Sequence, residues 1–153
     1  MSCPLVECLI IISTINHFVN TFLEKIFLLH EEFQKQNIRV DRLSRHLYDL
    51  YRLYHSEFKE KAIKNENLYK TIVAHRLEFT KISGIDYTLH HPKTINPIPL
   101  DNVIKEWEKD YEKMKTEMLY GKDKPEFSTI IDTINKLKKD LSNLNFKIIT
   151  VKE

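Results

Sequence analysis

The stretch Thr21–Gln34, with the sequence TFLEKIFLLHEEFQ, decides the fold class of this chain. Apolar residues recur along it every three to four positions, which predicts an amphipathic helix with one face in a core. Glu24 and Lys25 fall off that face, so they form either a solvated edge or the working edge of a site. The residues that set the period, including the flank of the stretch, are Phe18, Phe22, Ile26, Leu29 and Phe33.

Helical periodicity continues through most of the chain and predicts five helices, at about 20–36, 40–60, 65–82, 100–120 and 125–144. The third should bury Tyr69, Ile72, Val73 and Phe79, and the fourth should bury Trp107. Three of the five prolines lie in the segment 84–99, which we expect to be an extended loop because proline lacks the N–H that a helix needs.

The two chain ends differ from the rest. The segments ECLIIIST (7–14) and FKIITV (146–151) are short and β-branched, and either could be a strand. Paired, they would form a small two-stranded ribbon against the helices. The sequence therefore predicts a mainly α, five-helix bundle-like single domain over residues 1–153, with such a ribbon as an option.

Composition excludes several classes of protein. The chain has 153 residues and a net charge of +2, which offers no argument for nucleic acid binding. Its two glycines, Gly84 and Gly121, are too few for a P-loop or a dinucleotide-binding fingerprint. Cys3 and Cys8 lack the spacing of a CxxC motif, and no secretory signal is evident, so we expect a reduced, cytoplasmic protein. The apolar run 9–15 is too short to span a bilayer, so no membrane partner is expected.

The second predicted helix carries the best candidate for chemistry, in the stretch RVDRLSRHLYDLYRL (39–53). Arg42, Arg45, Asp49 and Arg52 are spaced by three, four and three residues and share one stripe, with His46 at its edge. Guanidinium groups match phosphate oxygens, so a phosphate-reading surface is one interpretation. Ion pairing between Arg45 and Asp49 on a solvated face is the more common origin of such a pattern.

Histidine and tyrosine give weaker signals. The seven histidines include an adjacent pair, His90 and His91, but no HxxxH spacing, so we predict no metal site. The seven tyrosines could stack on bases, although half-buried packing between helices is the more usual role.

Four blocks of sequence, taken in order, resemble a known family. They are TFLEKIFLLHEEFQ, RVDRLSRHLYDLYRL, TIVAHRLEFTKISGIDY and WEKDYEKMKTEMLYG. This order is similar to that of the AbiEii-type nucleotidyltransferase toxins of type IV toxin–antitoxin and phage-abortive systems. The resemblance covers about residues 14–145, nearly the whole chain.

The resemblance implies roles for individual residues. Lys25 would contact the nucleoside triphosphate, and Asp49 would support catalysis or orient that lysine. Arg45 matches a basic position of the family and His46 stands where many members carry an acid; both are expected in the nucleotide-binding set. Secondary members of the set would be Glu24, Arg42 and Arg52. Asn20 departs from the arginine that many members carry there.

The family's catalytic lobe has no counterpart in this sequence. That lobe carries a glycine turn and two acids that hold magnesium ions on the triphosphate, whereas no glycine precedes Gly84 here. We therefore expect a C-terminal half that is inactive alone, with magnesium and NTP bound only together with a catalytic lobe. Alternative functions are a module that pairs with a separate lobe, an antitoxin or a second copy through residues 9–15, and RNA binding, for example of tRNA, through the arginine stripe.

Overall fold

The computed structural model describes the backbone of residues 4–148 and the side chains of residues 12–148. Within these residues it is all α, which confirms the predicted fold class, and it contains no strand. The helices are α1 (Pro4–Glu32), α2 (Ser44–Tyr54), α3 (Phe58–Ile63), α4 (Glu66–His75), α5 (Ile104–Glu117) and α6 (Phe127–Ser142). A π-helical turn, η1 (Arg76–Thr80), follows α4, and a 3-10 turn, η2 (Tyr87–His90), lies in the proline-rich loop.

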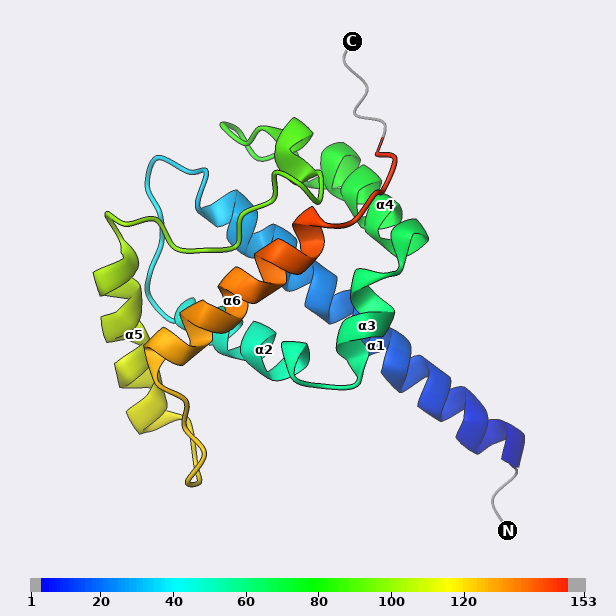
Figure 1. Ribbon diagram of the computed structural model, residues 1–153, viewed down its shortest axis with the longest axis horizontal. Helices are drawn as coiled ribbons and strands as arrows, with labels where there is room; N and C mark the ends of the chain where they lie inside the picture. Colours follow the sequence, from blue (N-terminus) through cyan, green and yellow to red (C-terminus); the bar gives the residue numbers. More distant parts are fainter. Residues whose placement is uncertain (1–3, 149–153) are drawn as a thin grey trace.

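Helix α1 is the centre of the fold. The apolar side chains of its second half are buried, and it packs against α2, α3 and α4. Its N-terminal turns extend away from the other helices (Figure 1). The largest of its buried side chains are Phe22, Leu23, Ile26, Phe27 and Leu29. Of the residues predicted to share the buried face, only Phe18 remains substantially exposed, at 38%.

The predicted two-stranded ribbon is wrong. Residues 7–14 are helical turns of α1, which begins at Pro4 rather than near Asn20. Proline is compatible with the first turn of a helix. The β-branched residues that follow it are helical because strand propensity is weak and is overridden by the structure around it. In the other segment, residues 146–148 have no regular structure, and residues 149–151 lie outside the described part of the chain.

The second predicted helix is two helices, α2 and α3, separated by a turn at 55–57. The Ser56 hydroxyl donates to the carbonyl of Leu53 at 2.6 Å and accepts from the backbone N–H of Phe58 at 3.2 Å. These bonds compete with the helical pattern, as serine side chains often do. The turn lets Phe58 stack on Phe18 with ring centroids 4.9 Å apart, which docks α3 on α1. No glycine or proline marks this break in the sequence.

Helix α2 is capped by a residue from α5. Leu43 at its N-cap position makes no side-chain cap, and Asp110 supplies the missing acceptor. One oxygen of Asp110 accepts from the N–H of Arg42 at 2.8 Å, and the other accepts from the N–H of Ser44 at 3.1 Å and from its hydroxyl. A carboxylate at this place satisfies free N–H groups and complements the helix dipole.

The later helices follow the sequence more closely. Asn65 caps α4 by accepting from the N–H of Leu68 at 3.0 Å. The predicted burial of Phe79 is wrong: its side chain is 70% exposed, because the π-helical turn η1 rotates the residues that follow α4 away from the helical register. Gly84, which lies beyond this turn, has φ of +83°.

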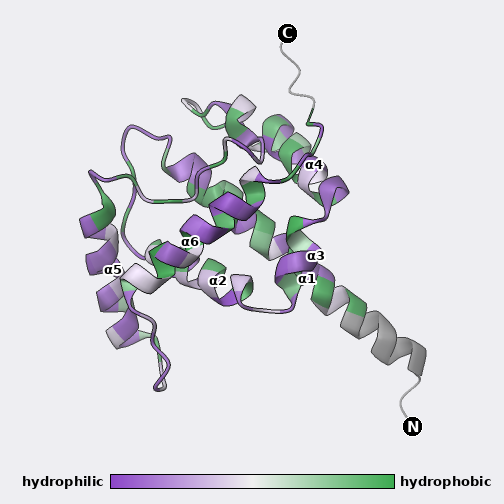
Figure 2. Ribbon diagram, in the orientation of Figure 1, coloured by the Kyte–Doolittle hydropathy of each residue, from purple (hydrophilic) through white to green (hydrophobic). Residues whose placement is uncertain are grey.

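Helices α5 and α6 each bury one apolar face, and Trp107 is fully buried in the core as predicted. Leu100 and Met118, on either side of α5, are 38% and 48% exposed and do not join this core. Figure 2 shows hydrophobic and hydrophilic residues alternating along both helices, as one-sided packing requires. Helix α6 lies against α2, and α5 also contacts α2, so α2 is held between α1 and the C-terminal pair. The buried side chains that α5 and α6 add to this core include Tyr111, Met114, Ile130, Ile134 and Leu137.

We predict that Asp110→Asn lowers the free energy of unfolding by about 2 kcal/mol, because it removes a charged cap and leaves donors at the start of α2 poorly paired. Urea denaturation followed by circular dichroism measures this. Asp132→Asn is the control, since Asp132 is exposed on α6. Equal stability of the two variants would contradict the capping role of Asp110.

Candidate functional site

Lys25 of α1 meets two residues of α2. Its Nζ lies 2.7 Å from Oδ2 of Asp49 and 3.1 Å from Nδ1 of His46. The lysine side chain is 18% exposed and that of Asp49 is 41% exposed, so the group sits at the surface edge of the α1–α2 contact. The structure thus brings together three of the residues that the sequence singled out: Lys25, His46 and Asp49.

The contact with Lys25 determines the state of His46. An ammonium group can only donate, so Nδ1 of His46 accepts and the ring proton of the neutral imidazole lies on Nε2. Burial, together with the positive charges of Lys25 and Arg45, lowers the pKa of His46 to about 4. At neutral pH His46 is therefore uncharged and holds the ammonium group of Lys25 as an acceptor.

The remaining arginines do not form the single stripe that their spacing suggested. Arg42 precedes α2 and has φ of +60°, so only Arg45 and Arg52 lie on the helix. Arg42 and Arg45 line a cavity of about 300 Å³ between the start of α2 and one side of α5. Arg52 is exposed farther along α2 and does not line this cavity.

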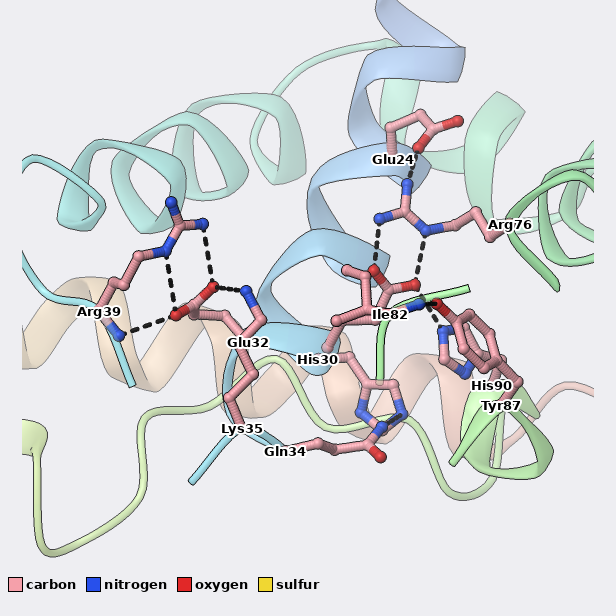
Figure 3. A network of polar contacts seen from close by, with 11 residues as sticks. Glu24, His30, Glu32, Gln34, Lys35, Arg39, Arg76, Ile82, Tyr87 and His90 are labelled. Atoms are coloured by element: carbon pink, nitrogen blue, oxygen red, sulfur yellow. Dashed lines mark hydrogen bonds and ion pairs between the residues drawn. The ribbon is translucent and has the colours of Figure 1, made fainter. Parts of the chain in front are cut away.

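Glu24 points to a different neighbour from Lys25. It pairs with Nη1 of Arg76, which also holds the buried Glu31 through two hydrogen bonds of 2.7 Å each (Figure 3). His90 contributes a further contact to Glu31 at 2.8 Å. Burial alone would raise the pKa of Glu31, but the bonds from Arg76 and His90 outweigh it and lower that pKa to about 2. Glu24 is thus part of a structural network.

No group of three or more His, Cys, Asp or Glu residues is arranged to hold a metal ion within the described residues. None of the helices in this part of the chain combines the length and apolar content that crossing a membrane requires. Sequence reasoning missed Lys113 and Asp110, which line the cavity beside Arg42. They lie in the charged run EKDYEKMK of α5, where nothing in the pattern distinguishes them from a solvated helix face.

We predict that the protein loses stability as the pH falls from 6.5 toward 4, in part through His46. Its pKa is about 4 in the folded state against 6.5 as the ordinary value, so the unfolded chain takes up more protons in this window. His30, whose pKa burial and His90 also lower to about 4, acts in the same direction. Replacing His46→Gln should remove on the order of 1–2 kcal/mol of the loss between pH 7 and 5.

Urea denaturation at pH 7, 6 and 5 measures this difference. The range stops at pH 5 because Glu31 also changes the stability at lower pH. Below its ordinary pKa of 4.5 the unfolded chain takes up a proton at Glu31, whereas the folded chain, in which this pKa is about 2, does not, so the stability that Glu31 provides is lost. Parallel stability curves for the wild type and His46→Gln would show that His46 is not held neutral by its surroundings.

Comparison with known proteins supplies the family. The model of the family described as nucleotidyl transferase AbiEii toxin, type IV toxin–antitoxin system, matches residues 16–133, well over half of the chain. This span includes Lys25, His46 and Asp49. No curated protein and no solved structure matches the chain significantly. The chain belongs to the AbiEii family of nucleotidyl transferase toxins.

Proposed function

We propose that this domain is the phosphate-facing part of a nucleotidyltransferase-like toxin, with Lys25 as the residue that meets the nucleoside triphosphate. The observation that carries the proposal is the placement of Lys25, whose ammonium group is held at 2.7 Å by Asp49 and at 3.1 Å by His46 while the side chain stays partly exposed. Membership of the toxin family supports the same role.

The chemistry of the ammonium group fits this task. Of its three N–H donors, two are used by Asp49 and His46, and one is left for an oxygen of the ligand. Because both partners belong to α2, the position of the charge is set before the ligand arrives, which lowers the ordering cost of binding. Asp49 acts as a positioning residue in this proposal, and Arg45 adds a second positive charge nearby.

We further propose that the domain does not transfer nucleotides by itself. In the family, acids of a separate lobe hold the magnesium ions that bridge the phosphates. Magnesium and NTP would then react only in a complex with that lobe, and the toxin would be neutralised by an antitoxin. Lysine alone can hold a phosphate as a point charge but supplies neither the metal nor a base.

We expect Lys25→Ala to weaken the binding of magnesium–NTP to the full chain by roughly 10-fold or more, the loss typical of a charged hydrogen bond. Isothermal titration with each of the four nucleoside triphosphates measures it. Lys136→Ala is the matched control, because Lys136 is an exposed lysine of α6. Equal affinity of the two variants would remove Lys25 from the nucleotide site.

Incorporation of labelled NTP tests the proposal that the domain does not transfer nucleotides by itself. Incorporation into tRNA or protein by the wild-type chain, above the Lys25→Ala background, would refute that proposal.

A protein-interaction role is the second candidate, and the N-terminal turns of α1 favour it. They extend away from the other helices (Figure 1), and Ile12 is 49% exposed there. Phe18, where α3 docks on α1, is still 38% exposed. Exposed apolar side chains on a projecting helix are typical of a surface that a partner covers. A separate catalytic lobe, an antitoxin or a second copy would each fit this description.

Self-association is the version of this role that can be tested without a partner. We expect a dimer that dissociates on dilution and is weakened by Ile12→Asp, because a buried charge would oppose the apolar contact. Light scattering coupled to size exclusion measures the mass over a range of concentrations. A monodisperse monomer at high concentration would exclude the second copy as the partner.

A further inference from the structure

The ring of His30, in the last turns of α1, contacts the loop 84–99 at two places. Its Nδ1 lies 2.9 Å from the backbone nitrogen of Asn96. Its Nε2 lies 3.0 Å from Nε2 of Gln34 (Figure 3). The amide oxygen of Gln34 in turn accepts from the backbone N–H of Asp86 at 2.8 Å. A chain of polar groups therefore joins the two ends of the loop through one imidazole ring.

These contacts cannot all be hydrogen bonds at the same time. The N–H of Asn96 can only donate, so Nδ1 of His30 has to accept, and the single proton of a neutral ring then lies on Nε2. That proton faces the NH2 group of Gln34, which is also a donor.

Each way of removing this conflict loses one bond to the loop. If the Gln34 amide turns over, its oxygen accepts from the ring, but its NH2 group then faces the N–H of Asp86. If the ring proton moves to Nδ1, Gln34 can donate to Nε2 and keep Asp86, but the N–H of Asn96 then faces a donor. The two ends of the loop therefore compete for His30.

A second ring proton does not change this at neutral pH. His30 is only 3% exposed, and burial together with the neighbouring His90 lowers its pKa to about 4. The ring is therefore neutral at pH 7 and carries one proton, on one nitrogen or the other.

Burial determines which of the two bonds is lost. Asn96 lies between Ile95 and Pro97, which are both buried, and its own side-chain oxygen is buried as well. An N–H without a partner there would be out of reach of water, which is costly. Asp86 is exposed, so its N–H can bond to water instead. The arrangement of lower energy keeps the bond from Asn96 and gives up the bond from Asp86.

We propose that residues 84–89 form a strap that opens and closes on the end of α1 under the control of the His30 tautomer. With the ring proton on Nε2, Gln34 turns its oxygen to the ring and the strap is open. With the proton on Nδ1, Gln34 holds Asp86 and the strap is closed. The open form is the major one at neutral pH, and the closed form is the minor partner of a two-state equilibrium.

The strap keeps its own turn when it leaves α1. The side chain of Asp86 accepts from the N–H of Thr88 at 2.9 Å, a bond that does not involve α1. Gly84, at the start of the strap, has φ of +83° and open space around it, so the backbone can pivot there. At the other end His90 is fully buried and contacts Glu31 at 2.8 Å. Movement is therefore confined to residues 84–89.

Opening of the strap changes the cover over a buried contact. The ring of His90 is stacked between Phe27 and Tyr87, with centroids 5.5 Å and 4.8 Å away. Phe27 belongs to the core, whereas Tyr87 is half-buried and is part of the strap. The position of the strap therefore controls how well the contact of His90 with Glu31 is shielded from water.

Hydrogen exchange of the full chain at pH 7, followed for each amide by NMR, tests the proposal. We expect the amide of Asn96 to be protected about 10-fold or more above that of Asp86, after correction for intrinsic rates. A long-range 15N–1H spectrum of the imidazole should place the proton of His30 on Nε2. Equal protection of the two amides, or a proton on Nδ1, would overturn the proposal.

Substitutions at Gln34 distinguish the strap from a loop that is held at both ends. Gln34→Glu supplies two acceptor oxygens, one for the ring proton of His30 and one for the N–H of Asp86. The protection of Asp86 should then rise by about 10-fold or more. Gln34→Ala should change it by less than about 2-fold, because its bond is already open in the major form. Gln36→Glu adds the same charge at an exposed position and is the control.

Two results with these variants would contradict the strap. One is a loss of about 10-fold in the protection of Asp86 in Gln34→Ala, because Gln34 would then already hold that end of the loop. The other is equal protection of Asp86 in Gln34→Glu and Gln36→Glu. The exchange and tautomer measurements on the wild type keep the test decisive if a variant does not fold.

Discussion

The buried carboxylate of Glu31 is the constraint on which the rest of the structure depends. Its side chain is 3% exposed, and a charge removed from water in this way must be paired and hydrogen-bonded. Arg76 supplies two bonds from the start of η1, directly after α4, and His90 supplies one from η2 (Figure 3). These bonds join α1 to two later segments and fix its position relative to the end of α4 and to η2.

The same network explains why two opposite charges stand side by side within an otherwise apolar helix. Successive residues of an α-helix point about 100° apart, so Glu24 and Lys25 face different neighbours. Glu24 joins Arg76 and the buried Glu31, while Lys25 turns to His46 and Asp49 of α2. One charge therefore fixes the helix, and the other is presented at an edge where a ligand can reach it.

Asp110 links the fold to the neighbouring cavity. It replaces the side-chain cap that Leu43 cannot provide, and it holds Arg42 in its left-handed conformation. The start of α2 is thus set by α5 and not by local sequence. Because Arg45 and His46 lie in the first turn of α2, their positions relative to Lys25 depend on this contact between distant parts of the chain.

The sequence by itself determined the all-helical class and most of the buried faces of α4, α5 and α6, and it singled out Lys25, His46 and Asp49, which the fold brings together. Periodicity is a local property of the sequence. The family model matches residues 16–133. Both can therefore be recognised without a structure. The contact of Lys25 with His46 could not be predicted from the sequence, since it joins residues on two different helices.

Only the tertiary structure decided the length of α1, the break at Ser56 and the cavity at Arg42. Residues 7–14 satisfy strand propensity as well as helix, and their place in α1 shows that context outweighs that preference. Ser56 gives no breaker signal, because its effect requires bonds to Leu53 and Phe58. Lys113 became a candidate only when folding placed α5 beside α2, since a cavity is a property of packed helices and not of spacing along one of them.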